Sequence, residues 1–446
     1  MSDWSPTSWQ AKPVAQDIAY DDAAALEGAL ARLRELPPLV NSWEIERLKS
    51  QLADAGQGKR FVLQGGDCAE TLADCRSEVI VAKLKILLQM SLVLIYGARK
   101  PVVRVARIAG QYAKPRSSPY ETRAGVTLPS YFGDLVNRRE FTPEARRADP
   151  ELLLTGYTRA ALTLNFVRSL AAAGFADLHH PEQWDLQFSS RADLDESLRA
   201  HYTQLTQVMG GSLAFLEALG ERSVGELGRV EFFTSHEGLN LHYEQAQTRT
   251  VPRRSGTYDL TTHLPWIGER TRALDGAHVE FFRGIENPVG VKLGPKTQPE
   301  EALALARTLN PRREPGKLVF ISRMGRTRAG HVEALAAALR VAGEPIVWLV
   351  DPMHGNTRST QAGQKTRDVS DILAEIEGSL DAHGRAGTHL AGVHIELTGD
   401  DVTECVGGEV REEDLDRNYA TVCDPRLNYR QSLELAFTIA GRLRSR

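Results

Sequence analysis

An unbroken apolar run ends at a polar cluster near residue 350. Residues 346–350 are Ile, Val, Trp, Leu and Val, and the sequence Asp-Pro-Met-His-Gly-Asn-Thr follows at 351–357. A short apolar run between Pro345 and Pro352 is typical of a strand that is buried on both faces. The polar cluster is then expected at the carboxyl end of that strand, where barrel enzymes place their active sites.

The same pattern, an apolar strand that ends at polar residues, recurs along the whole chain. The predicted strands are residues 61–63, 102–108, 230–234, 262–266, 289–293, 318–321, 346–350 and 393–397. Helix-like intervals separate most of them. Strands that alternate with helices in this way predict an α/β fold, a (β/α)₈ TIM barrel whose strands all direct their carboxyl ends to one face.

Hydrophobic periodicity predicts helices over residues 23–35, 42–55, 77–96, 150–173, 330–341, 366–383 and 430–442. Asn41 and Glu44 have the spacing of a capping box at the start of the second of these helices. Residues 1–56 are expected to form an N-terminal arm with helices that lies at a subunit interface. Residues 57–446 are expected to form the catalytic barrel, with a loop rich in Pro, Ser and Gly over 114–133 and a helical insertion at about 181–229, between the second and third strands.

Composition narrows the class of protein. The 446 residues include 54 Lys and Arg and 58 Asp and Glu, so the chain is not basic overall. This charge balance argues against nucleic acid as the main partner. We find no apolar run near the roughly 20 residues of a membrane span, and the N-terminus lacks the pattern of a signal peptide. A soluble cytoplasmic protein without a membrane partner is therefore expected. The four cysteines are too few and too scattered for a disulfide scaffold.

Candidate metal ligands converge at the predicted strand ends. Cys68 follows the first strand, His354 follows the seventh, Glu396 lies in the eighth, and Asp424 precedes Pro425 near the end of the chain. One thiolate, one imidazole and two carboxylates suit a divalent transition metal. These residues share no short motif, so the prediction depends on their joint placement at one face.

Basic residues form a second group at the same face. Arg107 and Lys292 lie inside apolar strands, where an unpaired charge would be costly, so they are expected to face an anionic ligand or a carboxylate. Further cations follow the strands at Lys114, Arg116, Arg270 and Arg323. Such a group binds phosphate and carboxylate, and arginine does so with two parallel hydrogen bonds. Two phosphorylated substrates would use all of these cations.

Six longer motifs resemble one enzyme family. They are Gly-Gly-Asp-Cys-Ala-Glu at 65–70, Gly-Gln-Tyr-Ala-Lys-Pro-Arg-Ser at 110–117, Trp-Ile-Gly-Glu-Arg-Thr-Arg at 266–272, Ile-Ser-Arg-Met-Gly at 321–325, the sequence at 351–357 and Glu-Leu-Thr-Gly-Asp-Asp-Val-Thr-Glu-Cys at 396–405. Together they are similar to the type II 3-deoxy-D-arabino-heptulosonate 7-phosphate (DAHP) synthases, and the resemblance covers essentially the whole chain. It implies a metal-dependent, aldol-like condensation of phosphoenolpyruvate with D-erythrose 4-phosphate that opens the shikimate pathway.

The resemblance also implies roles for individual residues. The metal ligands would be Cys68, His354, Glu396 and Asp424, holding Mn²⁺, Co²⁺ or another divalent ion. The phosphoenolpyruvate contacts would be Arg107, Glu269, Arg270, Lys292 and Arg323. The sugar-phosphate contacts would be Lys114, Pro115, Arg116 and Ser117. Among these, Lys114, Glu269 and Lys292 are the expected catalytic residues, with Glu269 orienting the attacking water and Lys114 delivering a proton near the aldehyde.

Further expectations concern assembly and regulation. The predicted extra helices over 193–220 resemble those that build an allosteric aromatic amino-acid site in longer family members, so feedback inhibition is expected, with tryptophan favoured. We also expect a homodimer or homotetramer and consider a chorismate mutase partner. Phe132 and Arg138 depart from the pattern of many family members, which have arginine and glycine there, and we expect this to concern local loop conformation or assembly contacts and not the reaction. Cys423 precedes Asp424, so oxidation is expected to join it to Cys68 and remove a metal ligand.

Three alternatives are weighed against this interpretation. A related barrel synthase acting on another aldose phosphate would use the same cations, but the long motifs argue against it. A catalytically silent barrel kept as a regulatory subunit would have lost a ligand or a phosphate-binding arginine, and none is missing. A metal hydrolase would need neither so many cations nor a buried Lys292.

Overall fold

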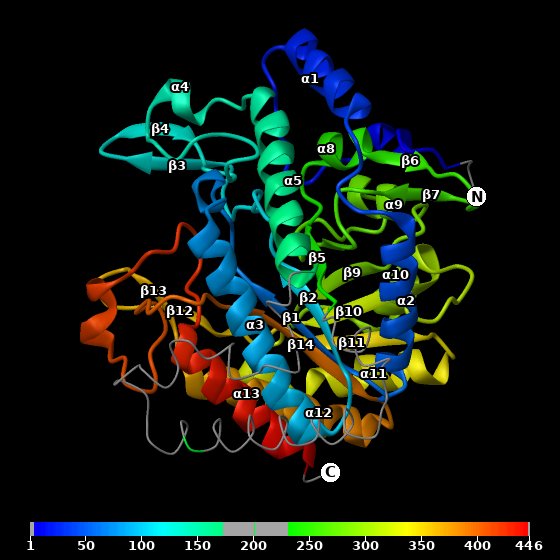
Figure 1. Cartoon of the computed structure of the whole chain (residues 1–446), viewed down its shortest axis with the longest axis vertical. Helices are drawn as coiled ribbons and strands as arrows, with labels where there is room; N and C mark the ends of the chain where they lie inside the picture. The colour runs from blue at the N-terminus through cyan, green and yellow to red at the C-terminus, as the bar shows by residue number, and fades with distance from the viewer. Residues whose placement is uncertain (1–3, 173–199, 201–230, 445–446) are drawn as a thin grey trace.

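The computed structural model describes residues 4–172, 200 and 231–444, and its centre is a closed barrel of parallel strands (Figure 1). The strands are β1 (Phe61–Gly66), β2 (Val102–Arg107), β5 (Phe233–Glu237), β8 (Leu264–Ile267), β9 (Val289–Leu293), β10 (Leu318–Ser322), β11 (Ile346–Val350) and β14 (Leu390–Glu396). Around the barrel their order is β1-β14-β11-β10-β9-β8-β5-β2. The predicted barrel and its strands are confirmed. The bounds of β5 differ most from the prediction, because this strand was predicted over 230–234 and extends to Glu237.

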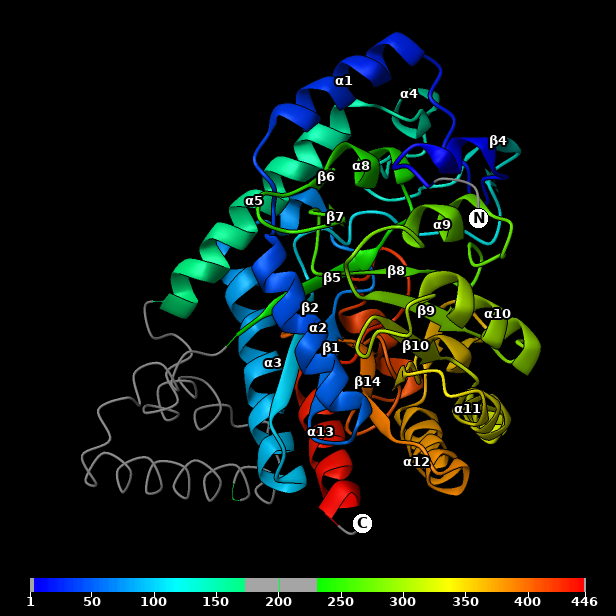
Figure 2. The same ribbon diagram turned by 90° about the vertical axis from the view of Figure 1, so that its right-hand side faces the viewer.

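Helices surround the barrel (Figures 1 and 2). They are α3 (Ser77–Ala98), α5 (Glu151–Ala172), α9 (Ala277–Phe282), α10 (Pro299–Leu309), α11 (His331–Val341), α12 (Val369–Ala386) and α13 (Tyr429–Arg444). Smaller elements on the loops are α4 (Pro143–Arg146), α8 (Leu241–Ala246) and the hairpins β6 (Thr248–Thr250) with β7 (Thr257–Asp259) and β12 (Thr357–Ser359) with β13 (Lys365–Arg367). α3 and α13 approach closely because Gly97 has no Cβ, which would otherwise overlap Ala440.

The amino end of the barrel is closed by α2 (Ser42–Gly56), which follows α1 (Ala23–Glu35). The predicted capping box is present: Asn41 Oδ1 accepts from the Glu44 N–H at 3.0 Å, and Glu44 Oε2 accepts from the Asn41 N–H at 3.1 Å. Leu48 and Leu52 of α2 are buried in one apolar cluster with side chains from the strands, including Val62 and Val103 near the starts of β1 and β2. The opposite, carboxyl end therefore carries the accessible site.

The N-terminal arm packs on its own chain through two tryptophans. Trp4 Nε1 donates to the carbonyl oxygen of Glu280 at 3.0 Å, and Trp9 Nε1 donates to Gln245 Oε1 at 2.9 Å. Trp9 belongs to a short 3₁₀ turn, η1 (Ser8–Ala11). Its side chain is buried and packs edge-on against the ring of His242. The arm is thus anchored without a second subunit, and its place at a subunit interface stays a prediction.

One part of the irregular loop predicted over 114–133 is ordered as a hairpin. It consists of β3 (Tyr120–Arg123) and β4 (Val126–Pro129), joined at Ala124 and Gly125, which have φ of 48° and 82°. Positive φ at both central positions is typical of the tight hairpin turns that match strand twist. The predicted insertion at about 181–229, and the helices within it over 193–220, lie outside the described residues.

Helix α3 contradicts the expectation that no apolar stretch of this chain is long enough to span a membrane. Its 22 residues are long and apolar enough to cross a membrane by length and composition, although the sequence analysis found no such stretch. In the structure α3 is mostly buried, where it packs against β1, β2 and α13. A core helix of a barrel meets the same criteria as a membrane span because it too is apolar on most of its surface.

Candidate active site

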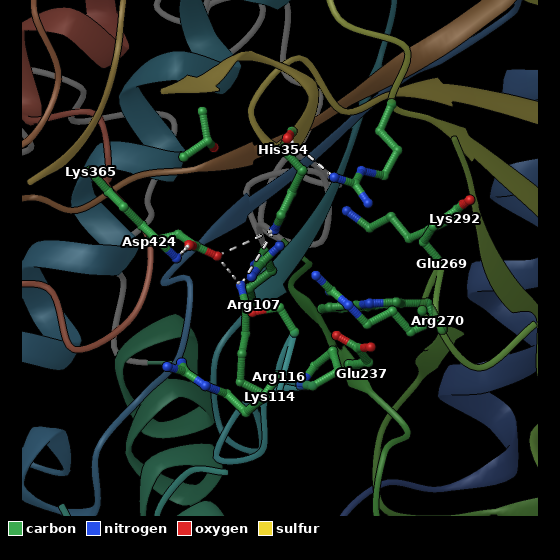
Figure 3. Close-up of a pocket in the computed structure, with 16 residues that line it drawn as sticks. Arg107, Lys114, Arg116, Glu237, Glu269, Arg270, Lys292, His354, Lys365 and Asp424 are labelled. Atoms are coloured by element: carbon green, nitrogen blue, oxygen red, sulfur yellow. Dashed lines mark hydrogen bonds and ion pairs between the residues drawn. The ribbon is translucent and has the colours of Figure 1, made fainter. Parts of the chain in front are cut away.

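A cavity of about 210 Å³ opens at the carboxyl ends of the strands (Figure 3). Every predicted substrate-contact residue lines it, together with two predicted metal ligands. The lining residues are Arg107, Lys114, Pro115, Arg116, Ser117, Glu237, Trp266, Gly268, Glu269, Arg270, Lys292, Arg323, His354, Thr357, Lys365 and Asp424. The sequence analysis did not single out Glu237, Trp266, Gly268, Thr357 or Lys365 as site residues.

The four predicted metal ligands come together beside this cavity. Donor atoms of Cys68, Glu396 and Asp424 all lie within 4.8 Å of one another. His354 Nε2 is 3.3 Å from Glu396 Oε1 and 4.0 Å from Asp424 Oδ2. Cys68 and Glu396 form the buried side of the cluster. Residues separated by as many as 356 positions therefore meet at one point, as their placement at the strand ends predicted.

A positive charge lies at the centre of this cluster. Lys114 Nζ is 2.8 Å from Cys68 Sγ, 3.2 Å from Glu396 Oε1, 3.1 Å from Asp424 Oδ2 and 3.4 Å from His354 Nε2. The cluster thus surrounds a cation in the described structure, and its sulfur, nitrogen and oxygen donors fit a divalent transition metal. A metal held by these donor atoms would displace Lys114 Nζ, which contacts the same atoms.

The carboxylates of Glu396 and Asp424, the two predicted acidic ligands, are kept ionised by their surroundings. Burial acts to raise the pKa of Glu396, but the positive groups of His354, Lys114, Arg367 and Arg107 hold this pKa well below its usual value. Arg107 Nη2 donates to Glu396 Oε1 at 3.0 Å, and Arg367 Nη1 donates to Oε2 at 2.7 Å. Arg367, on β13, was not predicted as a site residue. The hydrogen bond from Arg367 stabilises the ionised carboxylate of Glu396 and fixes its orientation.

Asp351 orients the imidazole of His354. The Nδ1 atom of His354 lies 2.7 Å from Asp351 Oδ2, and Asp351 Oδ1 accepts from the N–H groups of Met353 and His354. A proton on Nδ1 leaves the lone pair of Nε2 free to coordinate a metal, the usual arrangement when a carboxylate supports a histidine ligand. Asp351 belongs to the motif at 351–357, but its supporting role was not predicted.

Two of the predicted substrate-binding cations, Lys292 and Arg107, are buried close to Trp266. Lys292 forms an ion pair with Asp351 Oδ2 and lies 5.9 Å from the centre of the Trp266 ring, and Arg107 Cζ lies 5.1 Å from that centre. Burial lowers the pKa of Lys292 to about 8, against the raising effect of Asp351. The charge buried in β9 therefore has a partner, as predicted, and remains available at the cavity surface.

The other predicted contacts are less enclosed. Arg323 Nη2 donates to the carbonyl oxygen of His354 at 3.1 Å, while Arg270 has no ion pair with any described residue. Both oxygens of Glu269 accept from Arg272 at 3.1 Å. Pro115, Arg116 and Ser117 follow Lys114 at the outer part of the cavity, where Arg116 is half-buried and Ser117 exposed.

The main chain at Phe132, one of the two departures from the family pattern, supports the position of Lys114. Phe132 is buried in an apolar cluster with Tyr112 and Leu135, and its carbonyl oxygen accepts from the Lys114 N–H at 2.9 Å. Arg138 is exposed and pairs with Asp149 at 3.2 Å. Neither side chain lines the cavity, which agrees with the expectation that these two departures concern loop structure.

Comparisons with known proteins agree with the motifs. A sequence model of the class-II DAHP synthetase family matches residues 4–440. The chain is 46% identical to phospho-2-dehydro-3-deoxyheptonate aldolase of Neurospora crassa over 99% of this chain and 94% of that protein. It is 48% identical to the protein of that name from Streptomyces coelicolor, over 97% of this chain and 96% of the relative. The resemblance inferred from the motifs is confirmed: the chain belongs to the class-II DAHP synthetase family.

Proposed function

We propose that this chain, a 3-deoxy-7-phosphoheptulonate synthase by its family, joins phosphoenolpyruvate to D-erythrose 4-phosphate at the cavity and releases phosphate. The observation that supports this assignment best is the adjacency of two features. A cluster of one thiol, one imidazole and two carboxylates lies directly beside a pocket lined by cations. An aldol-like condensation of two phosphorylated substrates needs both an electrophile activator and binding sites for several negative charges.

The activator is a divalent metal ion, with Mn²⁺ or Co²⁺ favoured, held by Cys68, His354, Glu396 and Asp424. When bound, such an ion supplies Lewis-acid polarisation of the sugar aldehyde. The mixed donor set supports a transition metal over Mg²⁺ or Ca²⁺, which take oxygen ligands almost exclusively. Lys114, displaced from the donor atoms, is then free to face the sugar and to give a proton to the aldehyde oxygen as it becomes a hydroxyl.

Phosphoenolpyruvate binds at four cations of the cavity, the buried Arg107 and Lys292 and the more exposed Arg270 and Arg323. They hold its phosphate and carboxylate so that carbon 3 faces the aldehyde carbon, and the new bond forms between these two atoms. Carbon 2 then carries positive charge, and water adds to it. Glu269, fixed by Arg272, orients this water and accepts its proton. The resulting hemiketal phosphate expels inorganic phosphate to leave the ketone.

Erythrose 4-phosphate contacts Lys114, Pro115, Arg116 and Ser117, with its aldehyde end near Lys114 and its phosphate at Arg116 and Ser117. These residues are consecutive, and Gln16 of the N-terminal arm accepts from the Arg116 N–H at 2.7 Å, which fixes the segment. Arginine and hydroxyl groups at the outer part of a cavity suit the terminal phosphate of a short sugar whose aldehyde reaches inward.

The test is phosphoenolpyruvate consumption by metal-stripped protein, with and without erythrose 4-phosphate, during titration with Mn²⁺ and then Co²⁺. We expect consumption that requires both the sugar phosphate and the metal, with one phosphate released per phosphoenolpyruvate. Folded protein that binds phosphoenolpyruvate but consumes none under any metal would favour a regulatory subunit or another aldose phosphate instead.

Regulation and assembly extend this proposal. Feedback inhibition by an aromatic amino acid, with tryptophan favoured, is proposed from the length of the chain, since the insertion concerned lies outside the described residues. Enzyme activity that is unchanged by all three aromatic amino acids would contradict it.

We also propose a cytoplasmic homodimer or homotetramer with residues 1–56 at the interface. Light scattering tests this assembly, and the mass of a monomer would contradict it. Binding of a chorismate mutase is tested by co-elution with purified enzyme.

Oxidation is expected to inactivate the enzyme through Cys423. A hydrogen bond with Cys68, together with Lys114 and Arg116, lowers the pKa of Cys423 to about 7 against the effect of burial. Its thiolate is therefore partly formed at neutral pH and is the group that peroxide oxidises first. Attack by Cys68 on the resulting sulfenic acid forms a disulfide and releases water, which removes Cys68 as a metal ligand.

The measurement is the rate at which peroxide abolishes Mn²⁺ binding. Cys423→Ser is expected to lose Mn²⁺ at least about 10-fold more slowly than the parent, because no partner remains for Cys68. Cys75→Ser is the control, since Cys75 donates to the carbonyl oxygen of Arg159, away from the cluster, and this variant should respond like the parent. Equal rates of loss in the parent and Cys423→Ser would contradict the disulfide.

A further inference from the structure

Glu237, at the carboxyl end of β5, has a buried carboxylate without a partner. The residue is 9% exposed, and its Oε1 atom is shielded from solvent without a hydrogen bond. Among the described residues, neither side-chain oxygen of Glu237 forms a hydrogen bond or an ion pair. The carboxylate points into the cavity (Figure 3).

Leaving such a group unpaired is costly for the fold. Transfer of an ionised carboxylate from water into a protein interior is unfavourable unless hydrogen bonds or opposite charges compensate. Burial raises the pKa of Glu237 even though Lys114, Lys292, His354 and Arg107 act to lower it. These cations are near enough to influence Glu237, but none lies within ion-pair distance of it. A purely charge-balancing role would place one of them in contact.

The surrounding chain nevertheless holds Glu237 in this position. Gly268 lines the same cavity, and a Cβ at this residue would overlap Oε1 of Glu237. Gln111 Oε1 accepts from the Glu237 N–H at 2.9 Å, and Gln111 Nε2 donates to the carbonyl oxygen of Ala113 next to Lys114. The backbone of Glu237 is therefore tied to the segment that carries the sugar-phosphate contacts.

The chemistry of the substrates indicates what Glu237 meets. Phosphoenolpyruvate offers only acceptor oxygens and carbon-bound hydrogens, so an ionised carboxylate would repel it. Erythrose 4-phosphate carries hydroxyl groups on carbons 2 and 3, and hydroxyls donate hydrogen bonds to carboxylates. We propose that Glu237 binds a hydroxyl group of the sugar phosphate and thereby selects the aldose substrate. This inference rests on the proposed function.

The expected kinetic effect is specific to the sugar. Glu237→Ala should lower kcat/KM for erythrose 4-phosphate by about 10- to 100-fold, the loss of one hydrogen bond to a charged group, with KM for phosphoenolpyruvate unchanged within about twofold. Glu237→Gln keeps an acceptor oxygen and should recover part of the loss. An altered KM for phosphoenolpyruvate with an unaltered value for the sugar would overturn the assignment.

Analogues that lack one hydroxyl identify the contact. The parent should lose a similar factor with either the 2-deoxy or the 3-deoxy analogue of erythrose 4-phosphate, and Glu237→Ala should lose nothing further with that same analogue. If Glu237→Ala and the missing hydroxyl reduce kcat/KM independently for both analogues, Glu237 contacts neither hydroxyl. A parent inactive with erythrose 4-phosphate itself would instead refute the proposed function.

Stability separates substrate binding from a structural role. Because Glu237 has no described partner, Glu237→Gln should keep or raise the Tm. Glu244 is the matched control, since it is also buried but bonds His236 Nε2 at 2.9 Å and Thr261 Oγ1 at 2.6 Å. Glu244→Gln should lower the Tm and leave KM for the sugar within about twofold. A fall in Tm for Glu237→Gln, with sugar kinetics unchanged, would show that Glu237 is structural.

Discussion

Replacing His354 by alanine is expected to reduce kcat by about 10³-fold or more, because the metal contributes several kcal/mol of charge stabilisation in the transition state. His354 is the only nitrogen ligand in the proposed set, and its Nε2 lies between Glu396 and Asp424. The remaining thiolate and carboxylates would bind Mn²⁺ more weakly and in a different geometry. Mn²⁺ affinity by calorimetry, together with kcat at saturating metal, measures both effects.

Two further variants sharpen this test. Asp351→Asn keeps the ligand but weakens the support of its imidazole, so Mn²⁺ affinity should fall by only about 10- to 100-fold. His389→Ala removes an exposed histidine at the opposite end of β14 from Glu396, and should leave metal affinity unchanged. An His354→Ala variant with parental kcat and Mn²⁺ affinity would exclude His354 from the ligand set.

Lys292→Met is expected to lower kcat/KM for phosphoenolpyruvate by about 10²- to 10³-fold, the usual result when a buried charged partner is removed. The ammonium of Lys292 faces the cavity between Asp351 and Trp266, so its loss removes positive charge from the place where an anionic substrate binds. Lys292→Arg should not restore activity, because the larger guanidinium does not fit beside Trp266 in the position of an ammonium.

The same lysine predicts a pH dependence. The pKa of Lys292 is lowered to about 8 by burial, and lysine carries its charge below its pKa. The value of kcat/KM for phosphoenolpyruvate should therefore be constant on the acid side of this group and fall as pH rises through about 8. This profile refers to the free enzyme, in which Lys292 titrates before substrate arrives.

Lys317 provides a matched control for Lys292. It is also buried, and burial lowers its pKa to about 7, but it precedes β10 and donates to the carbonyl oxygen of Ile285 at 2.5 Å, at the amino end of the barrel. Lys317→Met should change stability while KM for phosphoenolpyruvate stays within about twofold. Equal losses of phosphoenolpyruvate binding in both variants would show a general effect of removing a buried lysine.

The barrel could be predicted from sequence because its strands are short apolar runs with polar ends, a pattern that buried parallel strands impose. That pattern also placed Cys68, His354 and Glu396 at one face before any distance was known. Asp424 lies in no strand, so its candidacy as a ligand depended on the other three residues and was then implied by the family resemblance. An apolar run followed by polar residues indicates that those residues lie at the carboxyl end of a strand. The barrel then brings the carboxyl ends of its strands together at one face.

Contacts between side chains far apart in the chain could not be predicted in the same way. Arg367 supports Glu396 from strand β13, although the predicted helix began at residue 366, and the periodicity gives no sign that this basic residue is fully buried. Glu237 lies three residues beyond the predicted strand 230–234, and its lack of a partner among the described residues is a property of the folded structure alone. The hairpin at 120–129 was missed because its turn residues, Ala124 and Gly125, are not among the strongest hairpin signals.

The closure of the barrel by α2 determines the order in which molecules enter and leave. Because Leu48 and Leu52 fill the amino end, both substrates and both products pass through one opening. The cations proposed for phosphoenolpyruvate include the buried Arg107 and Lys292, whereas Arg116, proposed for the sugar phosphate, is only half-buried. A sugar bound first would block the way inward. We therefore expect phosphoenolpyruvate to bind first, so an inhibitor that mimics the sugar should bind more tightly to enzyme that already holds phosphoenolpyruvate.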